Sequence, residues 1–177
     1  MIKPGDTPLD PGVALGEPPR YAFDFRGRNR RPTRDPINAL LSLAYTLLAK
    51  DLTVIAAAVG FDPYLGFYHL PRPGRPALAL DLMEPFRPLL ADSVVITAIN
   101  NRMVYPENFV PAGRGVSLTT AGRKAFFRAY EQRMDQLVTH PMFDYRVSYR
   151  RLLEIQTRLL ARVVTGELTT YPVFVTR

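Results

Sequence analysis

The spacing of apolar residues along the chain predicts helix as the dominant secondary structure. From residue 36 to about 50 the apolar side chains recur at intervals of three and four, the period of one helix face. Asp35 followed by Pro36 favours a helix start, because aspartate is a good N-cap acceptor and proline fits the first helical position. A second helix is predicted from about Leu52 to Val59, ending at Gly60.

The pattern changes between residues 61 and 76, which are rich in proline and glycine and predict a loop. An apolar, helix-like segment follows from Leu78 to about Ile99, and Pro85 and Pro88 interrupt it. The remaining predicted elements are a small hairpin within residues 101–118, a helix from Thr119 or Thr120 to about Val138, a helix from about Val147 to Val164, and an extended tail.

The N-terminal residues show no helical period. Residues 1–20 hold five prolines and three glycines, which predicts a flexible tail. The alternating stretch from Tyr21 to Arg26 predicts a short strand or an extended arm. Because no internal repeat is visible, we expect one helical domain over residues 21–177. The predicted class is all-α: a helical bundle with a small β-hairpin and an extended N-terminal arm.

Composition excludes several kinds of chemistry. The chain has no cysteine, so disulfides, thiolate metal sites and cysteine nucleophiles are ruled out. Its two histidines are His69 and His140, so a metal site must rely on carboxylates and would suit Mg²⁺ or Mn²⁺. No apolar run approaches the roughly 18 residues of a membrane span and the first residues lack a signal-peptide core, so we expect a cytoplasmic protein.

Positive charge gathers at the two ends of the chain. The formal net charge is +7, with +3 over residues 1–34, −2 over 35–111 and +6 over 112–177. Binding of a polyanion by the ends, with a metal in the middle, would produce this distribution, and so would an ordinary basic surface. The densest cluster, Gly27 to Arg34 (GRNRRPTR), either grips phosphates at a helix start or forms a solvated turn.

One segment carries candidate chemistry. Asp81 and Glu84 are three residues apart on an apolar helix, so they share a face and repel each other. A divalent cation would relieve that repulsion, and His69 could fold back from the preceding loop to add a nitrogen ligand. Alternatively, Asp81 caps a helix and Glu84 pairs with Arg87. Because prolines donate no hydrogen bond, the carbonyls of Asp81 and Glu84 could be freed for water or ligand.

The surrounding motifs resemble the CRISPR-associated integrase family. The resemblance rests on GFYH at residues 66–69 and GRPALALDLMEPFRP at residues 74–88. It covers residues from about 21 to the end of the chain. Further matching pieces are the basic loop into NALL at residues 28–41, Asp92-Ser-Val-Val, Thr139-His-Pro and the C-terminal Tyr171 to Arg177.

The resemblance implies a divalent-metal-dependent DNA endonuclease and integrase of spacer acquisition. In that family the metal activates a 3′-hydroxyl, which attacks a phosphodiester of repeat DNA. The resemblance implies that His69 and Glu84 ligate Mn²⁺ or Mg²⁺, and that Asp81 is a second carboxylate ligand or a support. It also implies a homodimer, a second CRISPR-associated adaptation protein and DNA (spacer precursor and repeat) as partners. The expected DNA-binding residues are Arg28, Arg30, Arg31, Arg75 and Arg87.

The chain departs from that family in one respect. The family's first metal ligand is a glutamate about 65 to 70 residues before the histidine, and no matching glutamate precedes His69 here. We therefore expect an N-terminally truncated chain with an incomplete metal site and weak or absent catalysis. The alternative is a non-catalytic DNA-binding or interaction fragment derived from the family.

Three other features have plainer interpretations. Arg151, Glu154, Arg158 and Arg162 form one charged stripe on the last predicted helix, either solvent-exposed or a track for phosphates. His140 is expected to be a structural hydrogen-bonding residue. The aromatic residues expected in the core or a pocket wall are Tyr64, Phe67, Tyr68, Phe86 and Tyr130.

Overall fold

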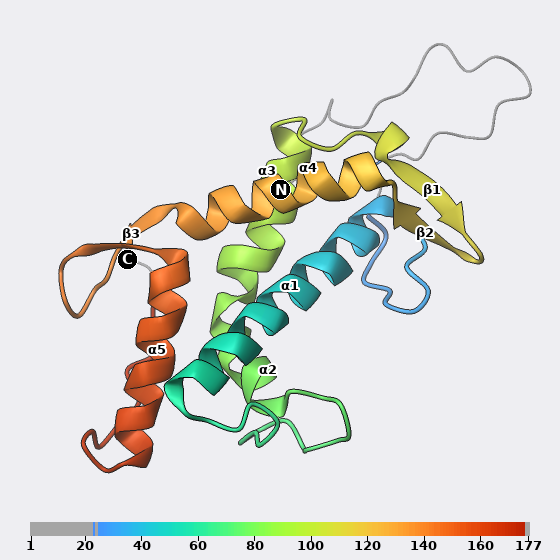
Figure 1. The fold of residues 1–177 in the computed structure, drawn as a ribbon. Helices are drawn as coiled ribbons and strands as arrows, with labels where there is room; N and C mark the ends of the chain where they lie inside the picture. The colour runs from blue at the N-terminus through green and yellow to red at the C-terminus, as the bar shows by residue number, and fades with distance from the viewer. Residues whose placement is uncertain (1–22, 24, 176–177) are drawn as a thin grey trace, which may run out of the picture. The chain divides into compact units, whose positions relative to one another are not determined.

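The computed structural model describes residue 23 and residues 25–175, and these are mostly helical with two small hairpins (Figure 1). The predicted tail at residues 1–20, most of the Tyr21–Arg26 arm and the last two residues lie outside the described residues. The helical class and the hairpin between residues 101 and 118 are confirmed.

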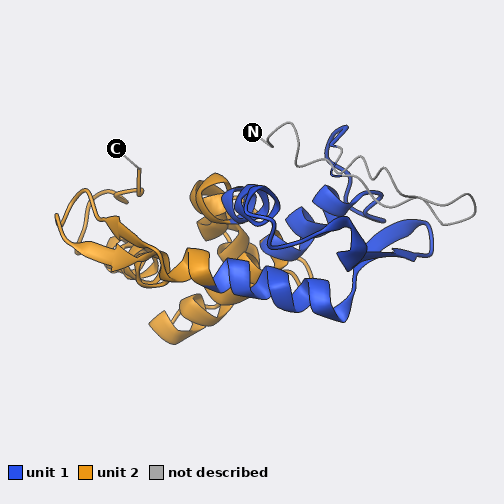
Figure 2. Ribbon diagram, turned by 90° about the horizontal axis from the view of Figure 1, so that it is seen from above, with its two compact units in different colours: residues 1–44, 91–131 blue, residues 45–90, 132–177 orange. Residues whose placement is uncertain are grey.

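The contacts form two compact units (Figure 2). Unit 1 comprises residues 1–44 and 91–131, and unit 2 comprises residues 45–90 and 132–177. Each unit is described by itself below. The single helical domain expected over residues 21–177 stays a prediction.

Helix α1 is Pro36–Val59, one continuous helix where two were predicted. The predicted boundary fell at Lys50 and Asp51, but neither residue stops a helix, and no glycine or proline lies between Pro36 and Gly60. Asp35 is its N-cap, since the Asp35 carboxylate accepts from the Asn38 N–H at 2.8 Å.

The length of α1 corrects one expectation. By length and composition this helix could cross a membrane, contrary to the prediction that no segment approaches that size. The core helix of a soluble protein passes the same test. Leu40, Ala44 and Leu48 are fully buried along one stripe, and Lys50 and Asp51 lie within the helix, so its pattern is also that of a core helix.

The apolar segment after residue 76 is broken as the prolines predicted. Helix α2 (Ala77–Met83) passes into a 3₁₀ turn, η1 (Glu84–Phe86), then a π-helical stretch, η2 (Arg87–Asp92), and finally α3 (Ser93–Asn100). The carbonyls at the break are not free, however. The Glu84 N–H donates to the Asp81 carbonyl and the Arg87 N–H donates to the Glu84 carbonyl. The tighter turn thus replaces the bonds that the prolines remove.

The first hairpin lies in unit 1. After the 3₁₀ turn η3 (Pro106–Asn108), strands β1 (Phe109–Ala112) and β2 (Gly115–Leu118) pair antiparallel. The Val116 N–H donates to the Thr33 carbonyl at 2.7 Å, which fixes the chain before α1 against β2. Gly115 allows this contact, because a Cβ there would lie 2.6 Å from the Thr33 carbonyl oxygen.

Helix α4 (Thr120–Asp135) ends earlier than predicted because the chain turns into a second hairpin that the sequence did not reveal. Its strands, β3 (Leu137–Thr139) and β4 (Arg146–Ser148), have three residues each, too few to show an alternating pattern. Helix α5 (Tyr149–Val164) begins after Ser148, whose hydroxyl accepts from the Arg151 N–H at 3.2 Å.

The C-terminal part of unit 2 packs on aromatic rings. Phe86 and Phe174 stack with ring centroids 6.1 Å apart. His140 is buried beside Phe143, and its Nδ1 accepts from the Met142 N–H at 3.2 Å, in agreement with a structural role. Burial lowers the pKa of His140, because the surroundings disfavour its charged form.

Candidate active site

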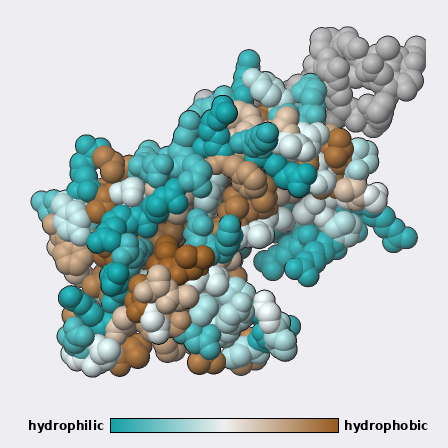
Figure 3. All heavy atoms as spheres, viewed as in Figure 1, coloured by the Kyte–Doolittle hydropathy of each residue, from teal (hydrophilic) through white to brown (hydrophobic). Residues whose placement is uncertain are grey.

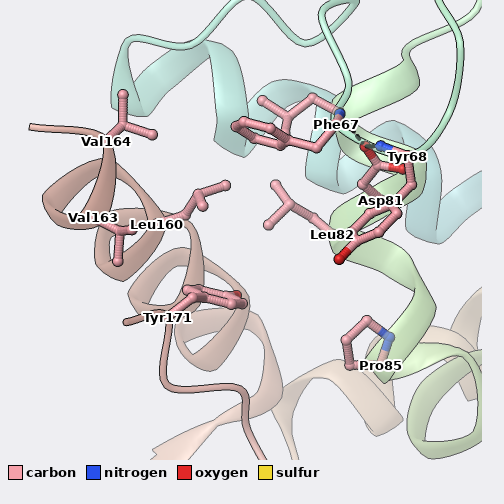
Figure 4. Close-up of a pocket in the computed structure, with 10 residues that line it drawn as sticks. Phe67, Tyr68, Asp81, Leu82, Pro85, Leu160, Val163, Val164 and Tyr171 are labelled. Atoms are coloured by element: carbon pink, nitrogen blue, oxygen red, sulfur yellow. Dashed lines mark hydrogen bonds between the residues drawn. The ribbon is translucent and has the colours of Figure 1, made fainter. Parts of the chain in front are cut away.

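The loop between α1 and α2 is fastened by a single carboxylate. Asp81 in the middle of α2 accepts backbone N–H bonds from Phe67 at 2.6 Å, Tyr68 at 3.0 Å and His69 at 3.0 Å, and Figure 4 shows the Phe67 and Tyr68 chain folded over it. The side chain of Asp81 is only 7% exposed. Asp81 therefore does not cap a helix N-terminus; it holds the GFYH loop in place.

The same carboxylate fixes the imidazole of His69. His69 Nδ1 lies 2.6 Å from Asp81 Oδ1. An ionised carboxylate can only accept, so the neutral ring carries its hydrogen on Nδ1 and its lone pair on Nε2. Because the His69 side chain is 26% exposed, Nε2 is a candidate metal-binding nitrogen. A carboxylate behind a histidine is the usual way in which a ligating ring is oriented.

The charge of Asp81 is well supported. Burial by itself raises the pKa of this carboxyl, but the hydrogen bonds from Tyr68, His69 and Phe67 outweigh that effect and lower the pKa below its ordinary value. Asp81 is therefore ionised at neutral pH and remains a hydrogen-bond acceptor.

Gly66 makes this arrangement sterically feasible. A Cβ at this position would lie 2.8 Å from the Ala77 Cβ, from Asp81 Oδ2 and from the His69 carbonyl oxygen. Such a contact is too short for any side chain, so the loop can approach α2 only at a glycine. The glycine of GFYH is thus explained by packing as well as by its resemblance to a motif.

Glu84 has a different partner from Asp81. Arg87 Nη1 lies 2.9 Å from one Glu84 oxygen and 3.1 Å from the other. The guanidinium also lies over the Tyr45 ring, 4.6 Å from its centroid. Burial lowers the pKa of Arg87, but hydrogen bonds and charge attraction from Glu84 and Tyr45 raise it overall, so the guanidinium stays charged. The pairing of Glu84 with Arg87 weighed in the sequence is therefore present.

The structure brings His69 and Asp81 together and pairs Glu84 with Arg87. Within residue 23 and residues 25–175, no group of three or more His, Cys, Asp or Glu side chains is arranged to hold a metal. His69 and Glu84 supply donors of the right type for Mg²⁺ or Mn²⁺, but the described chain does not complete such a set.

An apolar pocket of about 320 Å³ adjoins the GFYH loop that Asp81 holds in place. Figure 4 shows Leu160 of α5 and Leu82 of α2 facing each other across it, with Phe67 at one side. Burial raises the pKa of Tyr171, which also lines this pocket, to about 12. Phe67 and Tyr68 line the pocket and Phe86 and Tyr130 are buried, as predicted, whereas the prediction was wrong for Tyr64, which is exposed and does not line this pocket.

The loop around the pocket is unusually apolar at its surface. Its exposed large side chains are Tyr64, Leu65, Phe67, Tyr68 and Leu70, and Tyr68 is 91% exposed. Figure 3 shows apolar patches that interrupt the mainly hydrophilic face of the molecule. Arg72 and Arg75 follow in the same loop, where their backbones pair as a single antiparallel β-bridge.

The arginine-rich loop of unit 1 is ordered by Asn38. Asn38 is fully buried, and its side-chain oxygen accepts from Arg28 Nη1 at 2.7 Å and from the Asn29 N–H at 3.0 Å. Its amide donates to the Gly27 carbonyl and to Asp35. Arg28 is thus engaged in shaping the loop, whereas the exposed Arg30 and Arg31 have no partner within the described residues.

Sequence reasoning missed two contacts. The first is the role of Asp81 as a backbone anchor, for which the one available signal was Gly66, a glycine that permits close approach of the loop. The second is Tyr45 beneath Arg87, which carried no signal because it sits 42 residues earlier in a regular helical pattern. Among the predicted DNA-contact residues, Arg75 is half-buried and Arg87 is occupied by Glu84.

The charged stripe on α5 consists of ion pairs. Glu154 accepts from Arg151 at one oxygen and from Arg158 at the other, and Arg162 lies 3.8 Å from Glu167. Hydrogen bonds from Arg158 and Arg151 lower the pKa of Glu154 below its ordinary value. These partners occupy the arginines of the stripe, which favours a solvent-exposed face over a phosphate track.

The comparisons with known proteins agree with the motifs. The family model described as CRISPR associated protein Cas1 matches residues 15–132. A CRISPR-associated exonuclease Cas4/endonuclease Cas1 fusion of Geobacter sulfurreducens is 59% identical over 177 residues, which is 100% of this chain and 30% of that protein. This chain thus spans less than a third of that relative.

Two solved structures have a similar fold. A casposase bound to its integration product matches with a TM-score of 0.76 and 25% identity, over 83% of this chain and 42% of that chain. A Cas6-RT-Cas1–Cas2 complex matches with a TM-score of 0.71 and 26% identity, over 84% of this chain and 16% of that chain.

Proposed function

The chain belongs to the Cas1 family of CRISPR-associated proteins, and from this premise we propose that it is the helical catalytic part of a divalent-metal-dependent DNA endonuclease and integrase of spacer acquisition. The observation that carries the proposal is the His69 imidazole, whose Nδ1 is held by an ionised Asp81 so that Nε2 is available. The names of the Geobacter relative and the casposase support the same class of reaction.

His69 Nε2 and the Glu84 carboxylate would hold Mg²⁺ or Mn²⁺. Both donor types suit these ions, and the exposed fraction of the Glu84 side chain, 48%, leaves it accessible. The ion, when bound, would act as a Lewis acid that neutralises charge on the scissile phosphate. Because the described residues contain no group of three such donors, a further ligand is needed for a tight site.

The chain's own residues have distinct tasks in this proposal. Asp81 would orient His69 and keep its tautomer, and so acts as a positioning residue. Arg87 neutralises Glu84 and is itself supported by Tyr45, which places a cation beside the ligand set. Arg30, Arg31 and Arg75 would hold phosphates without reading sequence, with Arg28 shaping the loop that presents the first two.

The partners are proposed on the same grounds. DNA, comprising spacer precursor and repeat, would be the substrate, and a solved casposase bound to its integration product supports this choice. A second copy and a second adaptation protein would complete the assembly, as a Cas1–Cas2 complex among the structural neighbours suggests. The reaction would take place in the cytoplasm.

The first test measures metal-dependent cleavage of branched DNA by this chain, together with Mn²⁺ binding followed by the loss of the free-ion electron paramagnetic resonance signal. We expect His69→Ala and Glu84→Gln to weaken Mn²⁺ binding at least tenfold and to remove any cleavage, with an unchanged circular dichroism spectrum. Glu154→Gln is the matched control, because Glu154 is also a helical glutamate paired with arginine. Equal Mn²⁺ binding by the Glu84 and Glu154 variants would sink the ligand assignment.

A second candidate function is a non-catalytic DNA-binding or interaction module derived from the family. The absence of a third metal donor among the described residues favours it. Salt-sensitive DNA binding without any Mn²⁺-dependent cleavage would support this module over the enzyme.

A further inference from the structure

We propose that the outward face of α4 formed by Arg123, Lys124, Phe127 and Arg128, here called the α4 basic face, binds the phosphate backbone of double-stranded DNA. All four side chains are exposed, and they lie at helical positions that share one side of α4. The surface belongs to unit 1, whereas His69 belongs to unit 2, and it was not among the predicted DNA contacts.

The three cations of this face have no counter-ion. Arg123, Lys124 and Arg128 have no ion pair or side-chain hydrogen bond with any described residue. The arginines of α5 differ, because Arg151, Arg158 and Arg162 each lie within 4 Å of a glutamate. A cluster of three exposed, unpaired cations attracts a polyanion, whereas paired charges contribute little to such a field.

Charge is concentrated in the same unit. The described residues of unit 1 hold ten Lys and Arg against four Asp and Glu, while those of unit 2 hold ten against eight. The carboxylate of Asp35, one of the four, is taken up by Asn29 and Asn38. Folding therefore gathers positive charge that the sequence distributes between its two ends.

Hydrogen bonds within unit 1 connect the arginine-rich loop to the first hairpin and the hairpin segment to the start of α4. Thr33 of that loop is bonded to Val116 of β2, and the Thr119 N–H donates to the Asn108 carbonyl at 2.8 Å. Gly122 packs so closely on Asn108 that a Cβ would lie 2.7 Å away. Figure 1 shows the hairpin beside the start of α4 and the loop before α1, and both basic segments belong to unit 1 (Figure 2).

The side chains of this face favour a duplex over a single strand. Binding of single strands relies on aromatic rings that are free to stack on bases. Phe127 is the one aromatic residue of the face and is 40% exposed, so part of its surface is covered by the protein. Arginine and lysine side chains contact phosphates, and such contacts hold a duplex without reading its base sequence.

The test measures binding of a blunt duplex by fluorescence anisotropy in EDTA, across a salt series. We expect the triple variant Arg123→Gln, Lys124→Gln, Arg128→Gln to bind at least tenfold more weakly at low salt. The slope of log K against log salt should fall by about 2 to 3, because each lost phosphate contact removes roughly 0.9 from it. Since no metal is present, the result is independent of whether the His69 site is catalytic.

The matched control is Arg151→Gln, Arg158→Gln, Arg162→Gln on α5, which removes the same charge from a face whose arginines are paired. Its affinity and salt slope should stay close to those of the parent chain. An equal loss in both triple variants would overturn the proposal, because the effect would then be one of net charge. Failure of the parent chain to bind duplex would also overturn it and would point to an acidic protein surface as the occupant.

Single-stranded DNA of the same length separates the two modes of contact. Phe127→Ala should leave duplex binding within about twofold of the parent. A large loss of single-strand binding in Phe127→Ala, with duplex binding by the triple variant unchanged, would show a stacking surface and contradict the proposed duplex contact.

Discussion

Two loops of this molecule are each held by one polar side chain on a helix, and the two side chains differ in charge. In unit 1 the arginine-rich loop at residues 26–34 is tied to Asn38, and in unit 2 the loop at residues 61–76 is tied to Asp81. Each anchor is a polar side chain on a helix that accepts backbone N–H bonds from the loop. Both anchors are shielded while their loops are largely exposed: Asn38 is fully buried and the side chain of Asp81 is 7% exposed.

The difference between the anchors matches what each loop presents. A neutral amide holds a loop whose exposed groups are arginines, so the anchor adds no charge of its own to the basic surface. An ionised carboxylate holds a loop that ends in an imidazole, and its charge fixes the tautomer of His69. The arginine-rich loop therefore suits contacts with phosphates, and the loop at residues 61–76 suits the orientation of His69 as a metal ligand.

The largest expected effect is at Asn38. Asn38→Ala should lower the free energy of unfolding by about 3 kcal/mol, because the fully buried Asn38 amide makes hydrogen bonds to Arg28, to the Asn29 N–H, to the Gly27 carbonyl and to Asp35, and all four are lost together. Urea unfolding followed by circular dichroism measures this change. Asn29→Ala is the control, since Asn29 contacts the same loop from a more exposed position. Equal effects of the two variants would mean that burial is not the reason for the cost.

The next effect is at Asp81. Asp81→Ala should lower the free energy of unfolding by about 2 kcal/mol, less than Asn38→Ala, because water can reach the freed N–H groups of the exposed residues Phe67 and Tyr68. The loop should loosen more than the rest of the chain. Faster amide hydrogen exchange confined to residues 66–69 would show this, and a uniform increase across unit 2 would argue against a local anchor.

The smallest effect is the pH dependence of the Asp81 contribution. Because the pKa of Asp81 is lower in the folded than in the unfolded chain, its stabilisation is fully present above the unfolded value of 3.8 and is lost as pH falls through the folded pKa. The stability difference between the parent chain and Asp81→Asn should therefore shrink below pH 3.8. A difference that is constant down to pH 2 would show that the charge of Asp81 makes no contribution.

Local sequence determined the elements that depend on neighbouring residues. Asp35-Pro36 placed the start of α1, and Pro85 and Pro88 placed the break after α2, because both signals act through backbone bonds within one turn. The motif series from GFYH to the proline after Arg87 also indicated the family, which the family match then supported. The β3–β4 hairpin was beyond this reasoning, since three-residue strands carry no pattern.

The sequence by itself determined which residues were candidates for chemistry, namely His69, Asp81 and Glu84 with the arginine clusters. Only the tertiary structure decided how they are used, because their partners are distant along the chain. Asp81 reaches back 12 residues to His69, and Tyr45 supports Arg87 across 42 residues. The gathering in unit 1 of the cations of α4 and of the arginine-rich loop likewise depends on contacts between segments about 80 residues apart, which no periodicity or spacing can encode.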